Sequence, residues 1–160
     1  NDRLTNLKAN HKFSDLSETV RLAKEKYGIR TFFVWHAIQG YWRGVNVDSK
    51  AFESLKPEAK HFYMPPGIVE IDKEMKIANY GNSIISKFTY LKKRFGFGII
   101  PPKNLKLFYE SYHSYLKSNG VDGVKVDAQG MVGMLGQDFG GSVEITKSYH
   151  SALSQSISAY

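Results

Sequence analysis

Apolar residues near the start of the chain change their spacing at Gly28. Before it, they recur at helical intervals from Val20 to Tyr27, and Ser17 is a candidate N-cap, so we expect a helix that ends at Gly28. After it, Ile29 to Trp35 form an almost continuous apolar and aromatic run. Such a run is typical of a β-strand covered on both faces.

The same order of helix and strand recurs later. Asn104 is a candidate N-cap, a stripe of aromatic and aliphatic residues runs from Leu105 to Leu116, and Gly120 is placed to end the helix. Val121 to Asp127 has the pattern of the next strand. An Asp-Gly pair at its start also fits a hairpin turn, but no alternating strand of adequate length precedes it.

A third helix is predicted from Val143 to Ser158, after a glycine-rich stretch at 130–141 that we expect to be a flexible loop. The order helix, strand, helix, strand, helix is typical of a parallel α/β protein.

A long excursion, residues 40–102, separates the first strand from the second helix. It contains a short helical pattern at 49–55 and an amphipathic stripe from Ile84 to Leu91, which we interpret as a helix packed on the surface. A connection of this length is unusual in a compact domain, and such loops tend to be functional.

Charge and composition narrow the classes of partner. The net charge of +7 is spread along the chain rather than gathered in a stripe, which disfavours a nucleic-acid partner. The chain has no cysteine and no run long enough to span a membrane, so we expect a cytoplasmic protein without thiolate metal sites or disulfides. No dinucleotide or phosphate-loop motif is present, and no cofactor is expected.

Two charged residues end the second strand. Side chains alternate across a strand, so Lys125 and Asp127 share one face, while Val124 and Val126 share the other. In a closed barrel the charged pair would point inward at the carboxyl end of the strand, where active sites are built. A structural Lys–Asp ion pair is an equal alternative from spacing alone.

Aromatic residues follow the end of the first strand. Trp35 and His36 are succeeded by Tyr41 and Trp42, and flat rings beside polar groups suit a sugar. An aromatic core at a strand end explains the same pattern equally well. Four other histidines have no metal-ligand spacing and are interpreted as ordinary surface or helix-packing residues: His11, His61, His113 and His150.

These segments resemble the raffinose synthase and seed imbibition protein group, related to α-galactosidases of glycoside hydrolase family 36. The most specific blocks are VWHAIQGYW and DGVKVDAQ. Further matching stretches are RLTNLKANHKF, PPGIVE, PKNLKLFYESYHSYLKSNG and LGQDFGGSVEITKSYHSAL.

The resemblance implies a (β/α)8 barrel, of which residues 1–160 would be a central fragment of about two β/α units, with 40–102 as an active-site-rim excursion. It implies a retaining enzyme that acts on α-galactosides through a covalent galactosyl-Asp127 intermediate. Lys125 would hydrogen-bond the sugar hydroxyls, while Trp35 and His36 would line the galactose subsite and Tyr41 and Trp42 would bind substrate.

Some features depart from that family's pattern. The stretch from Gly67 to Asn104 is longer than expected, Arg43 replaces a glycine, and Ser142 replaces an arginine. The family's acidic strand motif and its acid/base carboxylate are absent, so the fragment alone is expected to be inactive. The alternatives are a non-catalytic sugar-binding or vestigial barrel segment and, less favoured, a basic phosphate or nucleic-acid binding module.

Overall fold

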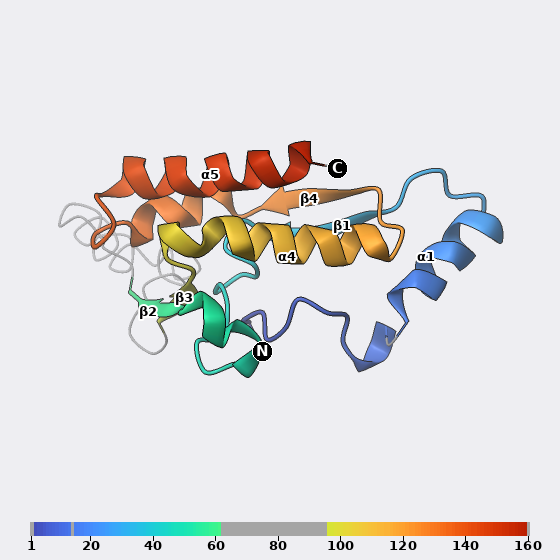
Figure 1. The fold of residues 1–160 in the computed structure, drawn as a ribbon, viewed down its shortest axis with the longest axis horizontal. Helices are drawn as coiled ribbons and strands as arrows, with labels where there is room; N and C mark the ends of the chain where they lie inside the picture. The colour runs from blue at the N-terminus through green and yellow to red at the C-terminus, as the bar shows by residue number, and fades with distance from the viewer. Residues whose placement is uncertain (1, 14, 62–95, 160) are drawn as a thin grey trace, which may run out of the picture.

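A pair of parallel strands lies at the centre of the computed structural model, which describes residues 2–13, 15–61 and 96–159 (Figure 1). Strand β1, Phe33–Ala37, pairs with β4, Gly123–Asp127, in a register that places Trp35 opposite Lys125 and Ala37 opposite Asp127. Parallel neighbours require a crossover connection, and here it includes helix α4, Leu105–Ser118. The carboxyl ends of both strands therefore lie at the same edge.

Asp122 ends this crossover and does not turn a hairpin. Its carboxylate accepts a hydrogen bond from the backbone N–H of Phe32 at 2.7 Å and pairs with Lys24 Nζ at 2.8 Å. Lys24 comes from helix α1, Leu16–Glu25, so this carboxylate joins three segments at the amino ends of the two strands.

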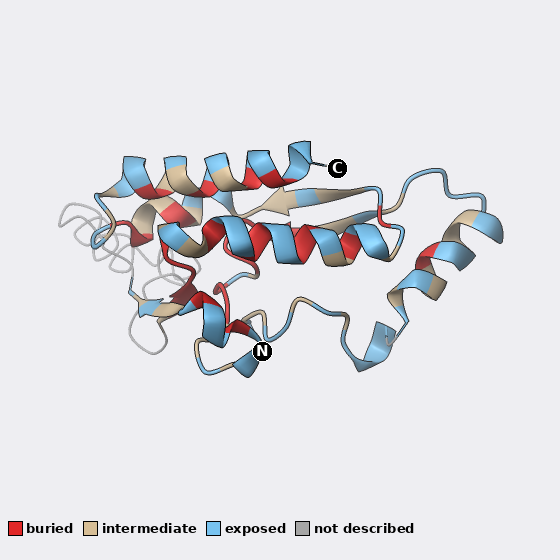
Figure 2. Cartoon of the chain, in the orientation of Figure 1, coloured by how far each residue is buried: buried red, intermediate tan, exposed pale blue. Residues whose placement is uncertain are grey.

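Helices α4 and α5, Ser142–Ser158, run side by side (Figure 1). The face of the strand pair that carries Val34, Val124 and Val126 packs against the buried core that these helices share. Figure 2 shows that the buried positions lie along the inner faces of the two helices, with exposed residues on their outer faces. Burial of such apolar stripes contributes roughly 25 cal/mol per Å2 of apolar area.

The helix bounds agree with the sequence patterns except at α1. Its N-cap is Asp15, whose side chain accepts from Glu18 N, whereas Ser17 was expected to cap it. Ser17 Oγ instead donates to the Asp15 carboxylate at 2.8 Å, which is consistent with the stronger capping of an ionised side chain at a helix N-terminus. Gly120 follows α4 with φ +81°, the left-handed conformation expected of a helix-ending glycine.

The first strand begins later than predicted. Ile29 and Phe33 are 45% and 62% exposed, so the expectation that this run is covered on both faces is wrong at its start. The glycine-rich stretch also contains regular structure. It contains the 3-10 helix η4, Gln129–Leu135, because Val132 and Leu135, three residues apart, are both buried beside α5.

The excursion at 40–102 carries a second, smaller sheet. Strands β2, Glu58–Lys60, and β3, Phe97–Ile99, are antiparallel, and the predicted helical pattern at 49–55 is the 3-10 helix η2, Lys50–Leu55. The stripe predicted at 84–91 lies outside the described residues.

Gly44 and Gly98 allow the first residues of the excursion to approach β3, which lies near its end. A Cβ atom at Gly98 would lie 1.8 Å from the carbonyl oxygen of Val45, and one at Gly44 would lie 1.7 Å from that of Gly98. Only glycine permits backbones to pass so closely.

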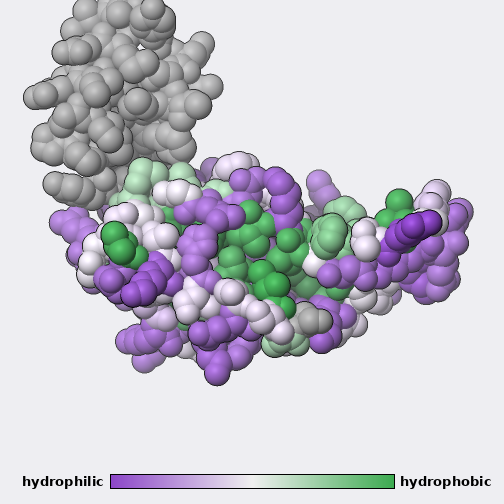
Figure 3. Space-filling model, turned by 90° about the horizontal axis from the view of Figure 1, so that it is seen from above, coloured by the Kyte–Doolittle hydropathy of each residue, from purple (hydrophilic) through white to green (hydrophobic). Residues whose placement is uncertain are grey.

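The described parts of the chain form two small sheets and no closed barrel, so the (β/α)8 barrel stays a prediction. Among the described residues, no helix is both long and apolar enough to cross a membrane. Figure 3 shows hydrophobic residues gathered near the middle of the viewed face and bordered by hydrophilic ones.

Candidate active site at the carboxyl ends of β1 and β4

Asp127 is the last residue of β4, and three donors hold its carboxylate. Oδ2 accepts from Trp35 Nε1 at 3.1 Å and from Lys125 Nζ at 2.9 Å, while Oδ1 accepts from the backbone N–H of Ala128 at 2.9 Å. The side chain is 45% exposed. The carboxylate is thus fixed in orientation while remaining accessible to a molecule from solution.

These donors favour the ionised form. The ammonium group of Lys125, then the indole N–H of Trp35 and the backbone N–H of Ala128, lower the pKa of Asp127 from 3.8 to about 2. At neutral pH the group is a carboxylate, the form that attacks an electrophilic carbon.

Ala128 shapes the turn after Asp127. It has φ 54° and ψ 32°, a left-handed conformation that a residue with a Cβ rarely adopts. Backbone strain of this kind costs roughly 1–3 kcal/mol and clusters at functional sites. Here the conformation accompanies a backbone N–H that points at the Asp127 carboxylate.

Aromatic rings form a wall beside the carboxylate. Trp35 contacts Tyr41 edge-on at 5.7 Å between ring centroids and Trp42 at 5.3 Å with a tilt of 38°. Trp42 is 53% exposed, and its carbonyl oxygen accepts from Gln39 Nε2 at 3.3 Å. A partly exposed indole next to a carboxylate matches the combination of apolar wall and few polar groups found in ligand sites.

The structure therefore brings five of the six predicted site residues together: Asp127, Lys125, Trp35, Tyr41 and Trp42. The sixth, His36, points to the opposite face of β1, where it is 1% exposed and lies 5.1 Å from the Tyr112 ring. The predicted place of His36 in the galactose subsite does not agree with this geometry, because adjacent residues of a strand face opposite ways.

The other four histidines take the ordinary positions expected of them. His11, His61 and His150 are exposed, and His113 is buried in the packing of α4. In the described ranges, no group of three or more His, Asp or Glu side chains is arranged to hold a metal ion.

Neither Arg43 nor Ser142, which depart from the pattern expected of the family, is among the donors to Asp127. Arg43 is buried, and its guanidinium donates to the Gly96 carbonyl at 3.2 Å and lies over the Phe97 ring. Ser142 begins α5, where a Cβ atom at Gly133 would lie 2.6 Å from its Oγ.

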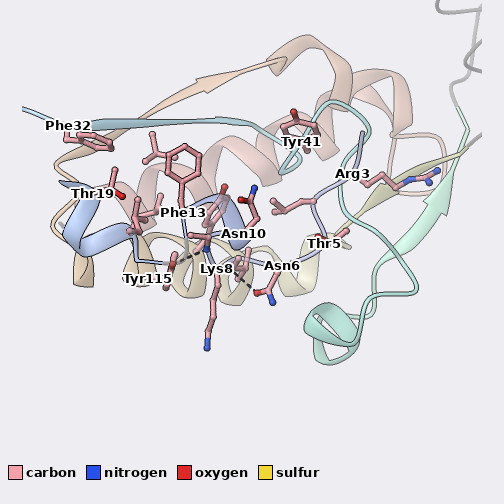
Figure 4. A pocket seen from close by; sticks show the side chains of 17 residues that line it. Arg3, Thr5, Asn6, Lys8, Asn10, Phe13, Thr19, Phe32, Tyr41 and Tyr115 are labelled. Carbon is pink, nitrogen blue, oxygen red and sulfur yellow. Dashed lines mark hydrogen bonds between the residues drawn. The ribbon is translucent and has the colours of Figure 1, made fainter. Parts of the chain in front are cut away.

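A cavity of about 530 Å3 lies near this site. It is lined by the N-terminal segment around Lys8 and Phe13 and by α4 residues such as Tyr115 (Figure 4). Tyr41 is common to this cavity and the aromatic wall. The other residues of the candidate site do not line this cavity: Asp127, Lys125, Trp35 and Trp42.

Sequence comparison supplies the family. The whole chain, residues 1–160, matches the family model described as raffinose synthase or seed imbibition protein Sip1. It is 38% identical over 97% of its length to probable galactinol–sucrose galactosyltransferase 6 of Arabidopsis thaliana, and covers 20% of that protein. It is 28% identical to a galactinol–sucrose galactosyltransferase of Oryza sativa subsp. japonica, in a match that covers 97% of this chain and 19% of that protein. It is 27% identical to stachyose synthase of Pisum sativum, in a match that covers 84% of this chain and 16% of that protein.

The chain thus spans 16–20% of the length of these relatives. It belongs to the raffinose synthase or seed imbibition protein Sip1 family.

Proposed function

We propose that this chain supplies the nucleophile and part of the sugar-binding wall of a retaining enzyme that transfers α-galactosyl groups. The observation that carries the proposal is the ionised, accessible Asp127 carboxylate, fixed by Lys125 and Trp35 at the ends of two parallel strands. Relatives named as galactosyltransferases support the same class of reaction.

In the first step, an oxygen of Asp127 attacks the anomeric carbon of the α-galactoside. The bond to the leaving group breaks, its oxygen takes a proton from a carboxylic acid elsewhere in the longer protein, and a β-linked galactosyl ester forms. In the second step, an acceptor hydroxyl gives its proton to the carboxylate left by that acid and attacks the same carbon from the other face. The ester bond to Asp127 breaks, which frees the Asp127 carboxylate and restores the α configuration. The low pKa of Asp127 suits both steps, because it keeps the carboxylate ionised and makes it a good leaving group.

The surrounding residues suit the binding of a sugar ring. The indole rings of Trp35 and Trp42 offer flat faces for the C–H groups of a sugar. Each aromatic contact of this kind contributes roughly 0.5–1.5 kcal/mol to binding in addition to the free energy of burying its surface. The Lys125 side chain is 69% exposed, so its ammonium group can donate to a sugar hydroxyl as well as to Asp127.

We also propose that β1 and β4 are neighbouring strands of a (β/α)8 barrel in a longer cytoplasmic protein. Their parallel pairing, the α4 crossover between them and the polar site at their carboxyl ends support this arrangement. The acid/base residue would then come from another strand of that barrel.

The test is an assay of the full-length protein with p-nitrophenyl α-galactoside, and separately with galactinol plus sucrose. Hydrolysis of the first indicates an α-galactosidase, and formation of a trisaccharide in the second indicates a transferase. Asp127→Asn should lower turnover about 10^4-fold, because the amide is a poor nucleophile. Asp48→Asn, an exposed position in the excursion, is the matched control and should retain activity.

Retained turnover in Asp127→Asn would exclude the nucleophile. Binding of galactose without turnover on any galactoside would instead support the non-catalytic sugar-binding alternative.

A further inference from the structure

Two buried histidines lie behind the candidate site. His36 of β1 and His113 of α4 are 1% and 4% exposed, and their Nε2 atoms are 3.3 Å apart. His113 Nδ1 lies 2.8 Å from Ser156 Oγ of α5, and His36 Nδ1 lies 2.8 Å from the Ala37 carbonyl oxygen. The chain of contacts runs from α5 through α4 to the end of β1.

The contacts determine where the protons are. The Ala37 carbonyl only accepts, so His36 Nδ1 carries a proton and its Nε2 is an acceptor. His113 Nε2 must then donate to His36, which leaves His113 Nδ1 to accept from the Ser156 hydroxyl. One added proton leaves these contacts in place, because the Ser156 hydroxyl can rotate and accept from His113 Nδ1, but it puts a charge on rings that are 1% and 4% exposed, which is costly.

The surroundings favour the neutral rings. Tyr109 and Tyr112 of α4 pack on the pair, with ring centroids 6.5 and 5.1 Å from that of His36. Burial, and then the charge of His36, lowers the pKa of His113 to about 4, and burial lowers the pKa of His36. Burial also raises the pKa of Tyr112 to about 12, so these tyrosines stay neutral.

The pair borders the part of β1 that forms the site. His36 lies between Trp35, which donates to Asp127, and Ala37, which is opposite Asp127 in the register. The backbone N–H of Ile38 donates to the Asp127 carbonyl at 2.8 Å. Tyr109 fixes this end from the same side as the histidines, because its hydroxyl donates to the Ile38 carbonyl at 2.6 Å.

We propose that the Ser156–His113–His36 chain is a positioning device that holds the end of β1, and with it Trp35 beside Asp127, only while both imidazoles are neutral. Acid then changes the site before it unfolds the chain. The inference concerns the geometry of Trp35 and does not depend on the galactosyl chemistry proposed above.

The tautomers can be tested directly on the full 160-residue chain. Long-range proton–nitrogen NMR correlations at neutral pH should show the proton on Nδ1 of His36 and on Nε2 of His113. The exposed His11, His61 and His150 serve as internal references. The opposite tautomer at either buried ring, or a charged ring at neutral pH, would overturn the proposal.

The positioning role is tested through the tryptophans. The chain has two, Trp35 and Trp42, and both belong to the site, so near-ultraviolet circular dichroism at their wavelengths reports on it. His113→Leu removes the donor to His36 and should change this signal at neutral pH while the helical far-ultraviolet signal persists. His113→Gln keeps an N–H donor and should restore the signal, and His150→Gln on the exposed side of α5 should leave it unchanged.

Should His113→Leu fail to fold, the unmodified chain still decides the matter. Its tryptophan signal should change in step with the NMR titration of His36 and His113, at a pH where the far-ultraviolet signal is intact. A tryptophan signal that stays flat through that titration, or one lost only together with the helices, would refute positioning.

Discussion

The pKa of Asp127 depends on two neighbouring side chains that can be removed separately. Lys125→Met deletes the ammonium group, the largest cause of the lowered pKa, and Trp35→Phe deletes the indole N–H but keeps an aromatic ring. We expect the pKa of Asp127 to rise from about 2 in both variants, and to rise further in Lys125→Met. The backbone N–H of Ala128 remains in each, so neither variant should exceed the ordinary value near 3.8 by much.

The lowered pKa of Asp127 also determines how the free energy of unfolding depends on pH. A carboxyl whose folded pKa is depressed binds fewer protons than in the unfolded chain, so its contribution is present above about pH 3.8 and is lost as the pH falls toward 2. Lys125→Met should remove part of this contribution, so the free energy of unfolding should fall less than in the unmodified chain as the pH is lowered from 3.8 toward 2.

The assay is a carboxyl-carbon NMR titration, in which Asp127→Asn identifies the resonance. Lys147→Met, an exposed position on α5, controls for the general loss of one positive charge. The reasoning fails if Asp127 titrates at its ordinary pKa in the unmodified chain. It also fails if Lys125→Met and Lys147→Met shift that pKa equally.

Three further predictions concern binding, activity and folding. In the full-length protein, Trp35→Ala should weaken inhibition by galactose about 2- to 10-fold, and an unchanged inhibition constant with lower stability would make this tryptophan purely structural. Purified chain 1–160 alone should show no α-galactosidase turnover, because its two parallel strands leave open edges where a barrel would be closed, and measurable turnover would contradict this. Gly98→Ala should lower the free energy of unfolding by about 1–3 kcal/mol in a urea titration, because its Cβ would lie 1.8 Å from the Val45 oxygen. Gly130→Ala, which has open space, is the control, and equal effects of the two substitutions would count against the close approach.

Alternation along a strand explains why most of the site was predictable. It places Lys125 and Asp127 on one face of β4, and the parallel register then sets Trp35 of β1 opposite Lys125. The same rule separates Trp35 from His36, whereas the family resemblance implied a shared galactose subsite. His36 instead lies among aromatic rings of α4, a position fixed by tertiary packing.

Other features depend on contacts that a local pattern does not contain. Ala128, whose backbone N–H donates to the carboxylate, adopts a left-handed conformation, for which glycine or asparagine would be the usual signal. The 3-10 helix at 129–135 buries Val132 and Leu135 beside α5, whereas its glycines suggested a loop. The contact between His113 and His36 joins residues 77 apart in the sequence.

The central claim is that Asp127 is the attacking carboxylate, and azide rescue in the full-length protein tests it most directly. Asp127→Gly should be inactive on an activated α-galactoside, and added azide should partly restore turnover, because the small anion fits the vacated space and attacks the same carbon. The product identified by NMR should be β-galactosyl azide, inverted at the anomeric carbon. No rescue in a folded Asp127→Gly variant, or an α-galactosyl azide, would contradict the account.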